Sequence, residues 1–287
     1  MLKIKLARHI GFCSGVRRAI KIAQDTLSKS KREVYSLGAI IHNPEVIKGL
    51  QKKGLRIAGS LNDIKADSCV ILPSHGSPRR ILAAAKKKKL KLIDVTCPYV
   101  SSVHKICSNL HKRGLKPVII GDRQHPEIKA LMDLVPDARL ISRIDEVPQD
   151  KFSYQKIGII SQTTQSREAF LDIVSSILRK NPLVKEVCVF NTICLDTVAR
   201  QEEVKKLAGA VDTLLVIGSS SSANTKRLLS IGKKVSRKTY LVENKNAPLS
   251  RMVKNAGTIG IISGASAPDW LAEEIVNSVK KIKNHKK

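Results

Sequence analysis

The sequence predicts an α/β protein made of three related lobes with parallel sheets, and two observations predict it. Short apolar segments that end in small or polar residues alternate with longer, helix-compatible segments, an alternation typical of parallel sheets covered by helices. The same features also recur three times in the same order along the 287 residues, as an internal repeat would require.

The first repeated feature is a cysteine that ends an extended segment and is followed by a helical pattern. It occurs at Cys13, Cys97 and Cys194. We therefore expect unit boundaries near Cys97 and Cys194.

The second feature is an apolar strand followed by a polar turn that opens a helix, in residues 35–45, 118–127 and 214–225. In the second copy His125 directly precedes a Pro-Glu pair, and in the first copy one residue separates His42 from such a pair. The third copy has Ser222 and Asn224 instead. The polar residue follows the cysteine of its unit at similar separations in all three copies, so the repeat extends beyond the hydrophobic pattern.

The third feature is another apolar strand that ends in small polar residues, in segments 69–76, 157–164 and 259–266. These segments carry His75, Thr163 and Ser266. Parallel sheets present functional groups at the carboxyl ends of their strands. Three equivalent sheet edges can therefore face one shared centre. The stretch between Pro136 and Pro148 is interpreted as a surface connection within the second unit.

The three repeated cysteines are candidate metal ligands. A structural zinc site usually has four ligands with tight local spacing, whereas three widely spaced thiolates favour an iron–sulfur cluster. Three protein ligands for a four-iron cluster leave one iron open, to act as a Lewis acid while the cluster supplies electrons. The other cysteines, Cys69, Cys107 and Cys188, are interpreted as buried structural thiols.

The polar residues at the helix starts indicate an anion site. Free backbone N–H groups at a helix start favour phosphate, and the histidines, serines and Asn224 add neutral donors. No Walker A motif or carboxylate pair for magnesium is present in the sequence. The implied ligand is a phosphate or diphosphate. Glu127 closely follows His125 and is the best candidate for delivering protons.

The composition has 52 Lys and Arg against 24 Asp and Glu, a formal net charge of +28. Nucleic-acid binding is one interpretation of this charge, but aromatic residues are not interleaved with the lysines as a stacking surface requires. Attraction to an anionic substrate or to an acidic electron donor explains the sign equally well. We see no signal peptide and no membrane-length apolar run, and expect a cytoplasmic protein with reduced thiols.

Five motifs together resemble one known family, 4-hydroxy-3-methylbut-2-enyl diphosphate reductase. They are Gly11–Val16 (GFCSGV), Asp94–Pro98 (DVTCP), His125–Glu127 (HPE), Gln162–Thr164 (QTT) and Ser263–Asp269 (SGASAPD). The resemblance covers nearly the whole chain, and the combination of motifs is highly specific.

The resemblance implies the last step of the non-mevalonate isoprenoid pathway, in which two electrons and two protons remove an allylic hydroxyl to give isopentenyl and dimethylallyl diphosphate. It implies three α/β lobes in a pseudo-threefold (trefoil) arrangement around one iron–sulfur cluster. The expected lobes are residues 14–96, 97–193 and 194–279, with residues 1–13 joining the third lobe and 280–287 forming a basic tail.

The same resemblance assigns roles to individual residues. Cys13, Cys97 and Cys194 would bind a [4Fe-4S] cluster, which becomes [3Fe-4S] if the open iron is lost. Glu127 would relay protons, and Thr163 would orient the hydroxyl end of the substrate. The diphosphate would be bound by six side chains: His42, His75, His125, Ser222, Asn224 and Ser266. The expected partner is an electron donor protein of the ferredoxin or flavodoxin type.

Two segments depart from the family pattern. The family often has Ser-Ser-Asn in the third unit, where this chain has Ser222-Ala223-Asn224 and so lacks one hydroxyl. The tract Asn191–Cys194 also differs from the commonest version. We expect the diphosphate to be held somewhat differently here.

Two other function classes compete with this interpretation. One is a hydrolase whose single metal ion is bound by His42, His75 and His125. The other is an RNA-binding protein without enzymatic activity, which the charge favours but which leaves the repeated cysteines and histidines unexplained. The colour and sulfide content of anaerobically purified protein separate the cluster enzyme from the hydrolase.

Overall fold

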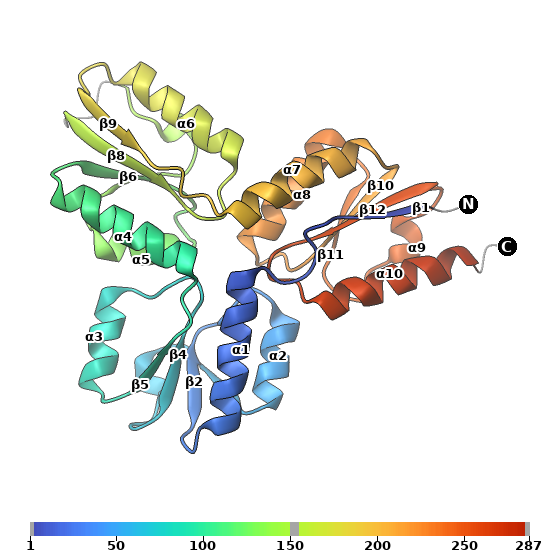
Figure 1. The fold of residues 1–287 in the computed structure, drawn as a ribbon, viewed down its shortest axis with the longest axis horizontal. Coiled ribbons are helices and arrows are strands. Elements are labelled where there is room, and N and C mark those ends of the chain that lie inside the picture. Colours follow the sequence, from blue (N-terminus) through green and yellow to red (C-terminus); the bar gives the residue numbers. More distant parts are fainter. Residues whose placement is uncertain (1–2, 150–154, 285–287) are drawn as a thin grey trace. The chain divides into compact units, whose positions relative to one another are not determined.

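A computed structural model describes residues 3–149 and 155–284 of the chain. These residues form three four-stranded sheets, and every strand pair in them is parallel (Figure 1). The predicted α/β class with three parallel sheets is confirmed.

The first sheet has the strand order β3-β2-β4-β5, and the second has the order β7-β6-β8-β9. The elements from α1 to β5 are α1 (Ser14–Lys29), β2 (Val34–Leu37), α2 (Pro44–Lys52), β3 (Leu55–Ala58), η1 (Leu61–Asp63), β4 (Cys69–Leu72), α3 (Arg79–Lys87) and β5 (Lys91–Asp94). Those from α4 to β9 are α4 (Pro98–Lys112), β6 (Lys116–Ile120), α5 (Pro126–Leu134), β7 (Arg139–Ile141), η2 (Ile144–Glu146), β8 (Lys156–Ser161), α6 (Arg167–Lys180) and β9 (Glu186–Val189).

The third sheet has the order β1-β12-β10-β11, so its edge strand comes from the start of the chain. Its elements are β1 (Lys3–Leu6), α7 (Leu195–Gly209), β10 (Thr213–Ile217), α8 (Ala223–Val235), β11 (Thr239–Val242), α9 (Leu249–Met252), β12 (Thr258–Ser263) and α10 (Asp269–Asn284). Read from β11 towards β1, this sheet repeats the order of the other two.

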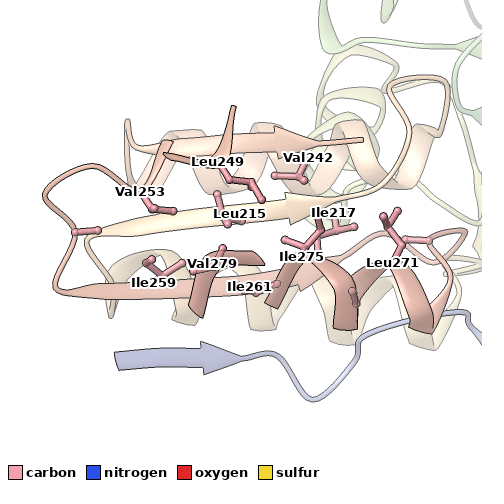
Figure 2. Packing of buried hydrophobic residues seen from close by; sticks show 13 residues of the cluster. Leu215, Ile217, Val242, Leu249, Val253, Ile259, Ile261, Leu271, Ile275 and Val279 are labelled. Atoms are coloured by element: carbon pink, nitrogen blue, oxygen red, sulfur yellow. The ribbon is translucent and has the colours of Figure 1, made fainter. Parts of the chain in front are cut away.

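The core of the third sheet shows why these residues form a two-sided α/β layer. Leu215 and Ile217 of β10 point to one face, where they pack with α9 and α10 (Figure 2). Leu214 and Val216 point to the other face, against α7 and α8. Because successive side chains of a strand alternate between faces, a strand covered by helices on both sides is apolar throughout. All five residues of β10 are buried.

One strand of each sheet departs from the sequence-based prediction. The segments that form β3, β7 and β11 are not among the three repeated features, and β7 lies within the stretch predicted to be only a surface connection. Each of them forms an edge of its sheet. The prediction that this stretch is a surface connection is therefore wrong, because residues 139–141 form a strand that pairs with β6.

By their internal contacts, the described residues fall into two compact units. Unit 1 holds residues 3–17, 42–48 and 195–284, and unit 2 holds residues 18–41, 49–149 and 155–194. The three lobe boundaries stay a prediction, and residues 285–287 of the predicted basic tail lie outside the described residues. None of the helices in the described part of the chain is both long and apolar enough to cross a membrane.

Candidate functional site

Cys13, Cys97 and Cys194 occupy the same topological position in the three sheets. Each follows the equivalent edge strand, β1, β5 or β9, and each directly precedes a long helix, α1, α4 or α7. The repeat predicted from the cysteines therefore matches the order of the sheets.

One backbone hydrogen bond recurs at all three cysteines. The N–H of Cys97 donates to the carbonyl of Ser74 at 2.9 Å, and that of Cys194 donates to the carbonyl of Thr163 at 2.9 Å. The N–H of Cys13 donates in the same way to the carbonyl of Ala265 at 3.1 Å. Each acceptor lies two residues beyond the end of the neighbouring strand, β4, β8 or β12. The three cysteines are thus bound to equivalent turns.

The surroundings of these cysteines suit thiolate ligands. All three are partly exposed and stand where a helix begins, next to backbone N–H groups that have no partner within the helix. The Sγ atom of Cys13 accepts a hydrogen bond from the N–H of Val16 at 3.4 Å. Three partly exposed sulfur donors at helix starts fit an iron–sulfur cluster better than a structural zinc site.

The other three cysteines divide into two kinds. Cys69 and Cys107 are buried, as predicted, and burial raises the pKa of the Cys107 thiol to about 11. Cys188 is only half-buried in the edge strand β9, where the Arg113 guanidinium lies 3.9 Å from its sulfur. The prediction of a buried Cys188 is therefore wrong, because an edge strand leaves one side of its residues open.

Glu127 and Thr163 form a buried pair in unit 2. The carboxylate of Glu127 accepts two hydrogen bonds, from the N–H and from the hydroxyl of Thr163, both at 2.7 Å. Burial raises the pKa of Glu127 to about 7, although both bonds from Thr163 act in the opposite direction. A carboxyl with such a pKa holds and releases a proton near neutral pH.

His125 caps the helix that carries Glu127. Its Nδ1 accepts a hydrogen bond from the N–H of Glu127 at 3.2 Å. An accepting Nδ1 is unprotonated, so the proton of the neutral ring sits on Nε2, which becomes the donor. The ring of His75 lies edge-on to that of His125, with 6.4 Å between the ring centres. Unit 2 therefore brings together two histidines that are predicted to bind the diphosphate.

In unit 1, His42 and Ser266 are joined through the start of α2. The Ser266 hydroxyl donates to the His42 carbonyl at 3.2 Å, and the Asn43 amide donates to the Ser266 carbonyl at 3.0 Å. Asn43, and not His42, caps α2, by accepting from the N–H groups of Glu45 and Val46. Burial and the nearby Lys226 ammonium lower the pKa of His42, so its ring is neutral at physiological pH.

Ser222 and Asn224 begin α8 in unit 1. The Ser222 Oγ accepts the N–H of Thr225 at 3.3 Å, which leaves its own proton available for donation. Asn224 is 4 % exposed, and neither atom of its amide has a hydrogen-bond partner among the described residues. A buried amide without partners is costly unless a ligand completes it.

Each unit brings together only part of the predicted site. Unit 1 holds Cys13, His42, Ser222, Asn224 and Ser266, and unit 2 holds Cys97, Cys194, His75, His125, Glu127 and Thr163. Within the described ranges, no three His, Cys, Asp or Glu side chains form a group that could hold a metal ion. The convergence of all three cysteines on one centre stays a prediction.

Two buried polar residues next to the site were not predicted. The side-chain oxygen of Gln162 accepts the N–H of Asp122 at 2.9 Å, and its side-chain nitrogen donates to the Thr164 hydroxyl at 2.8 Å. The Gln162 side chain therefore connects the turn before His125 to the turn that carries Thr163. Arg200 is buried in α7 and bonds to the segment before Cys13. The sequence signals neither role, because glutamine and arginine in such segments usually face solvent.

Comparison with known proteins connects this geometry to a family. The profile of the LytB protein family matches residues 4–280. The 4-hydroxy-3-methylbut-2-enyl diphosphate reductase of Aquifex aeolicus is 38 % identical over 285 residues, which cover 98 % of this chain and 97 % of that protein. The protein of the same name from Geobacter sp. strain M21 is 35 % identical over 99 % of both chains.

Solved structures agree with the sequence relatives. A structure of (E)-4-hydroxy-3-methyl-but-2-enyl diphosphate reductase, described as the terminal enzyme of the non-mevalonate pathway, has a TM-score of 0.71 and 37 % identity over 98 % of this chain and 100 % of that one. The reductase structure from Plasmodium falciparum has a TM-score of 0.90 and 30 % identity, over 96 % of this chain and 87 % of that one. The chain therefore belongs to the LytB protein family, that of the 4-hydroxy-3-methylbut-2-enyl diphosphate reductases.

Proposed function

We propose that this chain reductively removes the hydroxyl group of 4-hydroxy-3-methylbut-2-enyl diphosphate to give isopentenyl and dimethylallyl diphosphate. The observation that carries the proposal is the buried Glu127–Thr163 pair, in a chain that belongs to this reductase family over nearly its full length. Family membership favours an oxidoreductase over both the metal-dependent hydrolase and the RNA-binding protein.

The family is one of iron–sulfur enzymes, and we assign the cluster ligands of this chain to Cys13, Cys97 and Cys194. Their equivalent positions, partial exposure and places at helix starts support the assignment. When bound, a [4Fe-4S] cluster with three protein ligands supplies electrons and one Lewis-acidic iron. A [3Fe-4S] form would mean that this fourth iron has been lost.

Glu127 is the proton donor in this proposal. Its pKa of about 7 keeps much of the carboxyl protonated at neutral pH, so it can protonate the departing hydroxyl as water. Thr163 bonds both carboxylate oxygens of Glu127 and fixes their direction. In this proposal, the Thr163 hydroxyl orients the hydroxyl end of the substrate.

The diphosphate is bound by neutral donors in this proposal. His125 offers an Nε2–H because its Nδ1 accepts from the backbone. The Asn224 amide nitrogen, which lacks a protein partner among the described residues, donates to phosphate oxygens. Ser222 offers its hydroxyl proton, and His42, His75 and Ser266 complete the predicted set. Lys226, whose charge lowers the pKa of His42, adds the attraction of a nearby cation.

Two features of the cellular setting belong to the same proposal. Electrons come from a partner protein of the ferredoxin or flavodoxin type, whose acidic surface would suit a chain with a formal net charge of +28. We place the enzyme in the cytoplasm, where reducing conditions keep its cysteines available as ligands.

The decisive test is an anaerobic turnover assay. The chain is purified without oxygen, its iron and sulfide are measured, and it is incubated with the hydroxy-diphosphate substrate and a strong chemical reductant. We expect a brown protein that forms both diphosphate products. Cys13→Ser, Cys97→Ser and Cys194→Ser each abolish turnover, whereas Cys188→Ser, which removes the half-buried cysteine of β9, keeps it. A colourless zinc protein, or a cluster-loaded chain without turnover, contradicts the proposal.

A further inference from the structure

Arg200 is the largest fully buried side chain among the described residues. Its guanidinium forms a salt bridge with Asp196, one turn earlier in α7, with Nε and Oδ2 2.8 Å apart. The remaining donors bond to three backbone carbonyls, those of His9 at 2.7 Å, Ser263 at 2.8 Å and Gly11 at 3.0 Å. A buried arginine whose planar fork is used in this way fixes the groups around it in one arrangement.

Two of these carbonyls belong to the segment that leads to Cys13. The same face of α7 also presents Glu203, whose carboxylate accepts the backbone N–H of Arg8 and that of His9, the latter at 3.0 Å. The N–H of Gly11 donates to the hydroxyl of Ser263 at 2.8 Å. Residues 8, 9 and 11 of the segment 8–11 are therefore bonded to α7 or to the end of β12.

The connection before Cys13 is longer than its two counterparts. Six residues separate β1 from Cys13, whereas two separate β5 from Cys97 and four separate β9 from Cys194. A longer connection has more conformational freedom to lose when its end is fixed. Of the three connections, the one before Cys13 therefore has the most conformational freedom to restrain.

Position in the repeat shows that Arg200 is specific to this restraint. The residue six places after each cysteine is Ala19 in α1, Val103 in α4 and Arg200 in α7. Ala19 and Val103 are buried apolar residues. Only α7, which faces the long connection, has a buried charge at this place. Burying a charge is costly, and apolar residues fill this position in α1 and α4. The backbone carbonyls that Arg200 binds therefore account for the charge at this position in α7.

The conformation of the segment is also set from its other side. Gly11 has a φ of +81°, and a Cβ atom there would lie 1.7 Å from Oδ1 of Asp269. Asp269 in turn forms an ion pair with Arg17 at 3.0 Å. With the bond from the Cys13 N–H to the Ala265 carbonyl, the backbone on both sides of this cysteine is fixed within unit 1.

We propose that Arg200 is a positioning residue that holds the segment 8–11, and through it the thiolate of Cys13, in place for cluster binding. This inference rests on the proposed function, because it takes Cys13 as a ligand. The guanidinium of Arg200 bonds to Asp196 and to the backbone of His9, Gly11 and Ser263, so in this inference it acts through Cys13 and not on the substrate. Partners that orient metal ligands typically change metal affinity or activity by about 10- to 100-fold when they are mutated.

The first test uses the chain before cluster assembly. Backbone amide exchange of residues 8–13 and the alkylation rates of Cys13, Cys97 and Cys194 are compared in the wild type, Arg200→Met and Arg200→Lys. The matched control is Arg143→Met, which removes an exposed arginine–aspartate pair in unit 2. We expect about 10-fold faster exchange and faster alkylation at Cys13 in Arg200→Met, with Cys97 unchanged. Arg200→Lys, which keeps the charge but not the fork, changes in the same direction.

The second test uses the loaded protein, and the rate of iron release to a chelator is measured. We expect about 10-fold faster release from Arg200→Met than from the wild type or Arg143→Met. Folded Arg200 variants with wild-type exchange, alkylation and iron release overturn the inference. So does a failure of both variants to fold, since Arg200 would then support the whole unit and not one ligand. A wild type that assembles no cluster refutes the proposed function instead.

Discussion

The region around Glu127 (the Glu127 corner) and the region around Asn224 (the Asn224 corner) differ in how many hydrogen bonds the protein itself provides to their buried polar groups. In the first, Thr163 donates to both oxygens of the Glu127 carboxylate, and His125 caps the same helix. In the second, the buried Asn224 amide has no partner among the described residues for either of its atoms. A complete network holds a group still, whereas an incomplete one leaves bonding capacity for a ligand.

The difference suggests a division of labour. In the proposed function, the Glu127 carboxyl holds the proton that is transferred, and the Asn224 amide nitrogen donates to oxygens of the diphosphate. Both corners lie at the carboxyl ends of parallel strands, as is usual for ligand sites in this class of sheet. Variants that change only one of the two regions test this difference.

The largest effect is expected for Glu127→Gln, which keeps the shape but removes the proton. We expect kcat to fall by about 10²- to 10⁴-fold while KM changes little, as measured by anaerobic steady-state kinetics. The matched control is Glu45→Gln, because Glu45 has the same place in the first turn of α2 but is only partly buried. Unchanged kcat in Glu127→Gln with an intact cluster would exclude the proton role.

A second effect concerns stability and pH. Glu127 binds its proton more tightly in the folded chain, with a pKa of about 7 against an ordinary 4.5. Its stabilising contribution is therefore complete below about pH 4.5 and is lost as pH rises through about 7. Relative to Glu127→Gln, we expect the unfolding free energy of the wild type before cluster assembly to fall by about 3 kcal/mol over this range. Denaturant titrations at several pH values measure it, and parallel curves for the two proteins would contradict it.

A smaller effect with opposite signs is expected for Asn224→Leu. Loss of the amide should raise KM by about 10-fold, the usual scale of a hydrogen bond to a charged group. Unfolding free energy should not fall, and should rise by about 1 kcal/mol, because a buried amide without partners is removed.

The stability control is Asn43→Leu, since the Asn43 amide caps α2 and bonds the Ser266 carbonyl. That variant should lose about 1–2 kcal/mol. If Asn224→Leu lost as much stability as Asn43→Leu, the Asn224 amide would have protein partners in solution and the comparison would fail.

The smallest effect is expected for Ala223→Ser, which restores the hydroxyl that the family often has at this position. One additional neutral hydrogen bond to the diphosphate should lower KM by about 3-fold, with little change in melting temperature. A KM that stays the same or rises would mean that Ala223 does not face the diphosphate.

Much of the fold follows from the sequence because the hydrophobic pattern and the repeat agree. Central strands such as β6, β8 and β10 are apolar over most of their length and lead into turns that carry polar residues. The edge strands β3 and β7 are short and partly exposed, with mixed burial. Their patterns resemble those of surface loops, so only strand pairing reveals them.

The sequence predicts the candidate site residues best where the residue type and its repeat position indicate a chemical role. The cysteines and histidines stand out by type and by repeat position, and so does Glu127 beside His125. Arg200 and Gln162 do not, because their roles come from burial against backbone groups that are distant in sequence. The open bonding capacity of Asn224 is likewise a property of packing and not of its neighbours in the chain.

The most direct test of this division of labour is calorimetric titration of inorganic diphosphate into the wild type, Asn224→Leu and Glu127→Gln at pH 6. At this pH the Glu127 carboxyl is mostly protonated, so glutamine is a close mimic. We expect Asn224→Leu to weaken binding by about 10-fold and Glu127→Gln to leave it within about twofold. Equal weakening by both variants, or weakening by Glu127→Gln alone, would contradict the account.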